Sequence, residues 1–221
     1  MAATNICTEL KVIDHALGWL MSVPGASNTV IESVVTYSRM SMIQLLGKVP
    51  AQAASSQTVE EMTLLAYNRA LKLSKPGSPV LGVGFTGALA SARPKRGDHR
   101  FHLSTRTSDR LWSSTVTLTK GLRTREQEDA VSSQYLIKQD SRNFVPELTE
   151  SEVPDEYEKQ FDEDEELEQL LNGILCFKMY PFSSDTSDGE RKIILSGSFN
   201  PLHDGHLKLL EIAIRKDGHS V

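Results

Sequence analysis

The stretch I-I-L-S-G-S-F-N-P-L-H-D-G-H-L-K-L-L, residues 193–210, has the pattern of a strand, a short loop and a helix in succession. Its apolar beginning is typical of a buried strand, and the leucines at its end suit one face of a helix. Glycine and proline residues lie between the strand pattern and the helix pattern, as in a tight loop. Free backbone N–H groups and the positive end of a helix that follows such a loop bind phosphate. The sequence therefore predicts a phosphate site here, with His203 and His206 beside it.

Seven residues of this stretch match the signature Gly-Gly/Ser/Thr-Phe-x-Pro-x-His-x-Gly-His of the nucleotidylyltransferase superfamily. They are Gly197, Ser198, Phe199, Pro201, His203, Gly205 and His206. The segment resembles the first strand, loop and helix of that family's Rossmann-like domain. Members of the family join a nucleoside triphosphate to a phosphorylated acceptor and release pyrophosphate.

The resemblance implies a role for each matched residue. His203 and His206 are the expected catalytic residues, because nucleotidyl transfer depends on positioning and on fixed positive charge. The nucleotide and phosphate contacts that it implies come from Gly197, Ser198, Phe199, Asn200 and Gly205. It also implies Mg²⁺ bound with the nucleoside triphosphate in the full-length form. Nicotinamide or nicotinate mononucleotide is the expected acceptor, cytidylyl transfer to a phospho-alcohol competes with it, and the choice between ATP and CTP stays open.

The sequence departs from this family after the motif. Only fifteen residues follow His206, whereas one βαβ unit needs roughly 30. The family's second motif, an Ile-Ser-Ser-Thr-x-x-Arg type of segment that grips the triphosphate, does not occur in the sequence. We therefore expect a truncated product or alternative isoform that is inactive by itself and has no cofactor of its own.

Composition limits the partners of the chain. The 221 residues carry a net charge of −5, which does not favour nucleic acid. No apolar run is long enough for a membrane span, and no leader is evident at the N-terminus. The two cysteines, Cys7 and Cys176, are far apart and indicate a reducing compartment, which we expect to be the cytoplasm. The expected partners are thus a nucleoside triphosphate and a phosphorylated small molecule.

The first 140 residues alternate between helix and strand patterns, which predicts a mixed α/β layer domain over residues 8–140. Helices are expected near residues 10–20, 40–46, 58–73 and 124–137, and strands near 30–37, 80–85, 100–107 and 111–119. Residues 147–168 hold twelve acidic residues and one basic residue, so residues 141–173 are expected to be an acidic linker with a short helix. Residues 174–221 would begin the nucleotidylyltransferase domain.

The predicted α/β domain contains a second set of motifs, in order along residues 24–138. They are Pro24-Gly-Ala-Ser, Val34-Val-Thr-Tyr-Ser38, Leu45-Leu-Gly47, Ser56-Gln-Thr-Val-Glu-Glu-Met62 and Leu81-Gly-Val-Gly-Phe-Thr-Gly87. This region is similar to the C-terminal domain of the CinA family, whose active members hydrolyse the amide of nicotinamide mononucleotide. The resemblance implies a nucleotide pocket that includes Tyr37, Thr86 and Arg125.

The chemistry of that second family is not matched. Residues 10–20 stand where the family has its serine loop, Met42 replaces a lysine, and Val83 replaces a threonine. Amide hydrolysis by a serine needs a nucleophile and an activating group. We therefore expect a non-catalytic domain that binds a nucleotide or acts as a regulatory partner, associating through this domain into a homo-oligomer.

Two smaller patterns allow more than one interpretation. His99 and His102 have a spacing found in some metal sites, but without ligand-forming neighbours in the sequence they predict no metal. A small basic loop contains Arg93, Lys95, Arg96 and Arg100, and it is either solvated or in contact with phosphate.

Overall fold

The computed structural model describes residues 5–11, 15–75, 77–93, 95–137 and 148–176, together with residues 204, 205, 207, 208 and 212. The chain divides into two compact units, Met1–Met179 and Tyr180–Val221. In the second unit the five described residues are helical. All the strands described below belong to the first unit.

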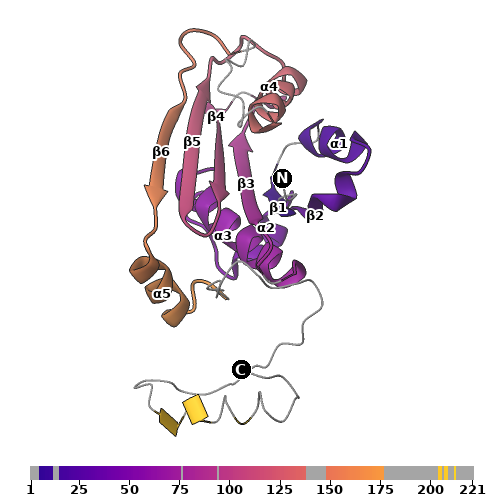
Figure 1. Cartoon of the computed structure of the whole chain (residues 1–221). Coiled ribbons are helices and arrows are strands. Elements are labelled where there is room, and N and C mark those ends of the chain that lie inside the picture. Colours follow the sequence, from indigo (N-terminus) through magenta and orange to yellow (C-terminus); the bar gives the residue numbers. More distant parts are fainter. Residues whose placement is uncertain are drawn as a thin grey trace. The chain divides into compact units, whose positions relative to one another are not determined.

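The first unit is built on a six-stranded mixed sheet with the order β2-β1-β3-β4-β5-β6 (Figure 1). The strands are β1 (Asn5–Leu10), β2 (Val30–Val35), β3 (Val80–Ala88), β4 (His99–Arg106), β5 (Arg110–Leu118) and β6 (Asp155–Gln160). β1 pairs in parallel with β2 and β3, whereas the pairs from β3 to β6 are antiparallel. The expected mixed α/β fold is confirmed.

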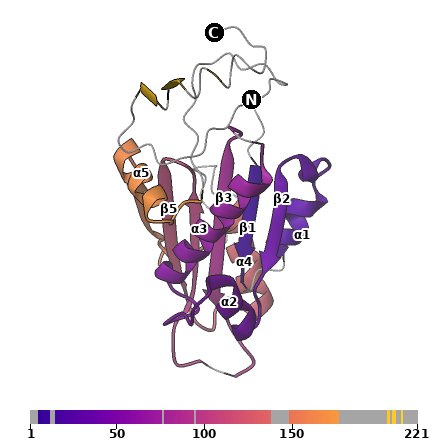
Figure 2. The same cartoon turned by 90° about the horizontal axis from the view of Figure 1, so that it is seen from below.

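Helices cover both faces of this sheet. They are α1 (His15–Ser22), η1 (Ala26–Asn28), α2 (Arg39–Leu46), α3 (Ser56–Leu73), α4 (Arg125–Ile137) and α5 (Glu163–Leu171). α3 crosses β1 and β3 on one face, as Figure 2 shows. α1 and α4 contact each other and contribute Ala16, Val131 and Tyr135 to the core on the other face.

Alternation along β3 separates the two faces. Val83 and Phe85 point into the core that α1 and α4 cover. Gly82 and Gly84 point at α3, where an added Cβ would lie 2.5 Å from the backbone nitrogen of Tyr67 and 2.4 Å from Oγ1 of Thr63. A side chain at either position would overlap the helix, so the two glycines let α3 pack directly on the strand.

Most local patterns give the expected elements. The hairpin of β4 and β5, the strand β2 and the helices α2 and α4 form within two residues of their predicted bounds. α3 begins at Ser56 rather than Thr58, because the Ser55 side chain caps it by accepting from the Thr58 N–H at 3.2 Å. The N-cap of α3 is therefore Ser55, three residues before the expected start of the helix.

The helix expected over residues 10–20 is corrected to a strand followed by a shorter helix. Leu10 ends β1, and α1 begins only at His15. Leu10 is fully buried in the core of the sheet, while Leu17 packs against the same core from α1. Their sequence spacing matches a helical period, but they belong to two elements that converge on one core.

The acidic segment also differs from the expected linker over residues 141–173. Residues 155–160 form β6, which pairs with β5 from Asp155 opposite Thr115 to Gln160 opposite Arg110. All six β6 residues are exposed, so their charges remain hydrated while the backbone completes the sheet. The predicted short helix forms as α5, capped by the Asp162 side chain, which accepts from the Glu165 N–H at 2.8 Å.

Glu152 anchors the start of this acidic segment. Its carboxylate accepts from both terminal guanidinium nitrogens of Arg123 at 2.7 and 2.8 Å, and from the N–H groups of Thr119 and Thr149. Burial raises the pKa of Glu152, but these hydrogen bonds outweigh burial and lower the pKa to about 2. The segment expected to be a solvated linker therefore contains a buried carboxylate with four hydrogen bonds.

Candidate functional site

The order of the parallel strands creates a point where two connections diverge. From β1 the chain runs through α1 to β2 on one side, and from β2 it runs through α2 and α3 to β3 on the other side of β1. The two connections lie on opposite faces of the sheet. In open α/β sheets, ligands bind outside the carboxyl ends of the strands at such a switch point. The candidate site of this chain is therefore the carboxyl ends of β1 and β3.

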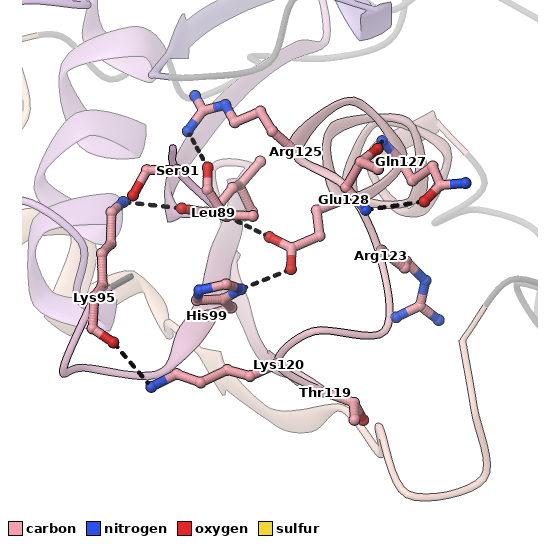
Figure 3. A network of polar contacts seen from close by, with 12 residues as sticks. Leu89, Ser91, Lys95, His99, Thr119, Lys120, Arg123, Arg125, Gln127 and Glu128 are labelled. Atoms are coloured by element: carbon pink, nitrogen blue, oxygen red, sulfur yellow. Dashed lines mark hydrogen bonds and ion pairs between the residues drawn. The ribbon is translucent and has the colours of Figure 1, made fainter. Parts of the chain in front are cut away.

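Two cations contact the backbone where β3 ends. Lys95 Nζ donates to the carbonyl oxygen of Leu89 at 2.9 Å, and the Arg125 guanidinium donates to that of Ala90 at 3.1 Å (Figure 3). Lys95 comes from the β3–β4 loop and Arg125 from the first turn of α4. The carboxyl end of β3 thus carries positive charge from two elements.

A buried carboxylate holds this arrangement together. Glu128 of α4 is fully buried, accepts from the Ala90 N–H at 2.5 Å, and lies 2.7 Å from Nδ1 of His99. Thr124 and Gln127 cap the same helix reciprocally, each side chain accepting from the other's N–H. Glu128 therefore does more than favour the helix dipole: it fixes α4 to both ends of the β3–β4 loop. Sequence reasoning missed this, because the two partners lie 29 residues apart.

The neighbouring carboxylate reaches the other strand end. Asp129 is also buried and pairs with Nδ1 of His15, the first residue of α1. Lys11 lies just beyond β1, where its N–H donates to the carbonyl oxygen of Phe85 at 2.9 Å. Burial lowers the pKa of the Lys11 side chain. α4 thus contacts the segments that follow both β1 and β3.

The three residues expected to line a pocket come from different elements. Arg125 lies at the end of β3, as described above. Thr86 is fully buried on the opposite face of β3, where its hydroxyl donates to the carbonyl oxygen of Ala53 at 2.7 Å. Tyr37 follows β2 and is 67% exposed. Of the three, Arg125 is the residue whose contacts place it at the switch point.

Most of the predicted nucleotidylyltransferase residues lie outside the described residues. They are Gly197, Ser198, Phe199, Asn200, His203 and His206. Gly205 is described, and it is helical in the second unit. The roles assigned to these residues stay predictions.

His99 and His102 do not face a common site. His99 pairs with Glu128, whereas His102 Nδ1 lies 2.8 Å from the hydroxyl of Thr115. Burial, together with the charge of Arg100, lowers the pKa of His102 to about 4, so the ring is neutral at pH 7. Within the described ranges, no group of three His, Cys, Asp or Glu side chains is arranged to hold a metal ion. Nor is any helix in that part of the chain both long and apolar enough to cross a membrane.

A cavity of about 440 Å³ lies along α4 on the side of the β5–α4 loop. It is lined by Leu122, Arg123, Gln127, Ala130, Val131 and Gln134. The Arg123 guanidinium in its wall is held by Glu152, as described above, so this charge serves the fold. The cavity is distinct from the strand ends that define the candidate site.

Comparison with known proteins finds similar solved structures. A competence/damage-inducible protein of Agrobacterium tumefaciens is 18% identical, with 61% of this chain and 83% of that chain covered and a TM-score of 0.46. A CinA superfamily protein of Escherichia coli is 12% identical over 61% and 78% of the two chains, with a TM-score of 0.48. A competence or damage-inducible protein of Enterobacter asburiae is 11% identical over 61% and 85%, with a TM-score of 0.49. No family model and no curated protein matches the chain.

Proposed function

We propose that the first unit binds a phosphorylated nucleotide at the carboxyl ends of β1 and β3 without transforming it. The observation that carries this proposal is the pair of cations at the end of β3, where Lys95 and Arg125 contact successive backbone carbonyls. Fixed positive charge at a topological switch point suits the phosphate of a nucleotide. Lys11, partly desolvated beyond the neighbouring strand, adds a third cation at this edge.

The hydroxyl and thioether groups near the candidate site are engaged in structural contacts, which favours a binding role over a catalytic one. The Thr86 hydroxyl donates to a backbone carbonyl, and the Thr36 hydroxyl donates to the sulfur of Met42 at 3.9 Å. Met42, which stands where the CinA family has a lysine, is buried in the core. Serine-type amide hydrolysis needs a nucleophile with an activating base beside it. These groups instead stabilise the fold.

Calorimetry on the purified chain tests this proposal. Nicotinamide mononucleotide, ATP and CTP are titrated separately, and chromatography after long incubation detects any conversion. We expect saturable binding of at least one nucleotide and unchanged ligand. Arg125→Gln should weaken binding by about fivefold or more, because it removes a charge-assisted contact of the kind worth 1–3 kcal/mol.

Arg110→Gln is the matched control, since Arg110 lies at the opposite end of β5 and the substitution removes the same charge. The control should bind like the wild type. If none of the three nucleotides produces a saturable heat signal at millimolar concentration, the proposal of binding is contradicted. Release of ammonia from nicotinamide mononucleotide would contradict the non-catalytic part.

Nucleotidyl transfer is the second candidate function, and it rests on the motif between Gly197 and His206. The reaction would be carried out by residues outside the first unit, with His203 and His206 on the phosphates. The longest reading frame that includes these residues is assayed for pyrophosphate release with ATP or CTP and a panel of phosphorylated acceptors. His206→Ala should abolish release. Equal release by wild type and variant would show that this motif is not the site.

A further inference from the structure

Two loops at one end of the sheet concentrate positive charge. Residues 89–100, which span the β3–β4 loop and the first two residues of β4, contain four cations and one carboxylate. Residues 119–125, which span the β5–α4 loop and the first residue of α4, contain three cations and no carboxylate. Each of these two segments therefore has a net charge of +3, on a chain whose net charge is −5. Because β3 and β5 run in the same direction, both loops lie at the same end of the sheet as the candidate site.

Hydrogen bonds join the two loops into one surface. Lys120 Nζ donates to the carbonyl oxygens of Lys95 and Arg96 at 3.4 and 3.1 Å. The Lys95 side chain in turn donates to Leu89, and Arg125 donates to Ala90 (Figure 3). The cations of one loop thus lie beside those of the other.

Five of these cations make up what we call the basic surface: Arg93, Lys95, Arg96, Lys120 and Arg125. In the part of the chain that the structure describes, no carboxylate lies within ion-pair distance of any of them. The other two cations of the loops differ, since Arg100 pairs with Asp98 and Arg123 with Glu152. The carboxylate of Glu128, in the same helix as Arg125, is fully buried and its oxygens are bonded to Ala90 and His99.

We propose that the basic surface binds the polyphosphate chain of a nucleoside triphosphate. This inference specifies the class of nucleotide for the site proposed above, and it rests on that proposed function. Cations without carboxylate partners repel one another, and a polyanion relieves that repulsion. A triphosphate carries more negative charge than a monophosphate and spreads it along a chain that can contact both loops. Arginine and lysine side chains are the usual phosphate ligands of proteins.

Binding of inorganic tripolyphosphate, ATP and AMP is measured by calorimetry in a low-salt buffer with EDTA, which prevents a metal ion from bridging. We expect tripolyphosphate to bind and to compete with ATP, and ATP to bind about tenfold or more tightly than AMP. The affinity for ATP should fall as salt is raised, because exposed charges are screened.

The double variant Arg93→Gln/Arg96→Gln isolates the basic surface. Both residues are exposed, so the variant should fold as the wild type does. It should bind ATP and tripolyphosphate about tenfold more weakly while its affinity for AMP changes little. The matched control is Arg110→Gln/Lys159→Gln, which removes the same charge from two cations that already pair with Glu158 and Glu165. The control should retain wild-type affinity.

The outcomes separate the two proposals. Equal loss of ATP affinity in variant and control, or no loss in either, overturns the basic surface as the polyphosphate site and leaves nucleotide binding intact. Binding of tripolyphosphate with no preference for any nucleotide overturns the proposed function but supports the surface. Tight binding of an RNA oligomer with no competition by tripolyphosphate would assign the surface to another class of partner and overturn the inference.

Discussion

Glu156 and Tyr157, adjacent residues of β6, fasten this strand to helices on opposite faces of the sheet. The Tyr135 hydroxyl of α4 donates to Glu156 at 2.7 Å, and the Tyr157 hydroxyl donates to Glu60 of α3. Successive side chains of a strand point to opposite faces, so one dipeptide can reach both helices. These two adjacent side chains thereby hold in place a strand that has no buried residue.

Removing one of these attachments should destabilise the first unit. Tyr135→Phe deletes the hydroxyl that donates to Glu156 and also contacts the Ser114 hydroxyl at 2.8 Å. We expect the free energy of unfolding to fall by about 1–2 kcal/mol, since a buried hydrogen-bonding group loses its partner. Urea denaturation measures the change. Tyr37→Phe, at an exposed position, is the control and should leave the midpoint unchanged.

Neutralising Glu128 should loosen the β3–β4 loop. Glu128→Gln weakens the hydrogen bonds to Ala90 and His99 in a fully buried setting. We expect a loss of about 2–3 kcal/mol, in the range for hydrogen bonds to buried charged groups. Glu126→Gln removes a charge from an exposed residue of the same helix turn and should change stability by less than about 0.5 kcal/mol. Similar losses in both variants would mean that the helix dipole, and not the loop contact, is the main role of Glu128.

A methyl group on β3 should force α3 away from the sheet. In Gly84→Ala the new Cβ would lie 2.4 Å from Oγ1 of Thr63 and 2.6 Å from the carbonyl oxygen of Val59. The second contact is with backbone, which cannot rotate away, so we expect a loss of about 3 kcal/mol or more. Gly97→Ala has open space around its Cβ and is the control. Thermal unfolding of the two variants compares them, and a stable Gly84→Ala protein would contradict the close packing of α3.

Acid should weaken the fold through Glu152. Its pKa in the folded protein is about 2, below the value near 4.3 of a free glutamate. The stabilisation is therefore complete above about pH 4.5 and is lost as the pH falls through 2. At pH 7 Glu152→Gln should cost roughly 3 kcal/mol, and the difference from wild type should shrink as the pH is lowered from 4.5 to 2. Urea denaturation midpoints of the two proteins are compared across this pH range. A difference in stability that stays constant with pH would show that the charge of Glu152 is not its cause.

Elements with a local signature could be predicted from the sequence. The β4–β5 hairpin follows from alternation on both sides of a polar turn, and α4 follows from its acidic first turn and apolar face. β1 and β6 could not be predicted in this way. Leu10 is buried in a core that strands distant in sequence complete, and β6 pairs with residues of β5 that lie 40 to 50 positions earlier in the chain.

The same limit applies to the candidate site. Arg125 was expected at a nucleotide pocket from a family resemblance, and its contact with Ala90 places it at the switch point. Thr86 was also expected at this pocket, but its side chain faces α3. Alternation along β3 places it on the same face as Gly82 and Gly84. The pairs of Glu128 with His99 and of Asp129 with His15 join residues far apart in sequence, which no local pattern indicates.

Glu128 and Asp129 are adjacent on one turn of α4, so their two contacts should couple the movements of the segments that they hold. Glu128 contacts the segment after β3, and Asp129 contacts the start of α1. A helix moves as a rigid body, so a tilt of α4 that lengthens one contact also strains the other. Opening of the two segments should therefore be correlated rather than independent. Hydrogen exchange in Glu128→Gln would then speed up at the amides of α1 as well as at Ala90, whereas faster exchange at Ala90 alone would show that the segments open separately.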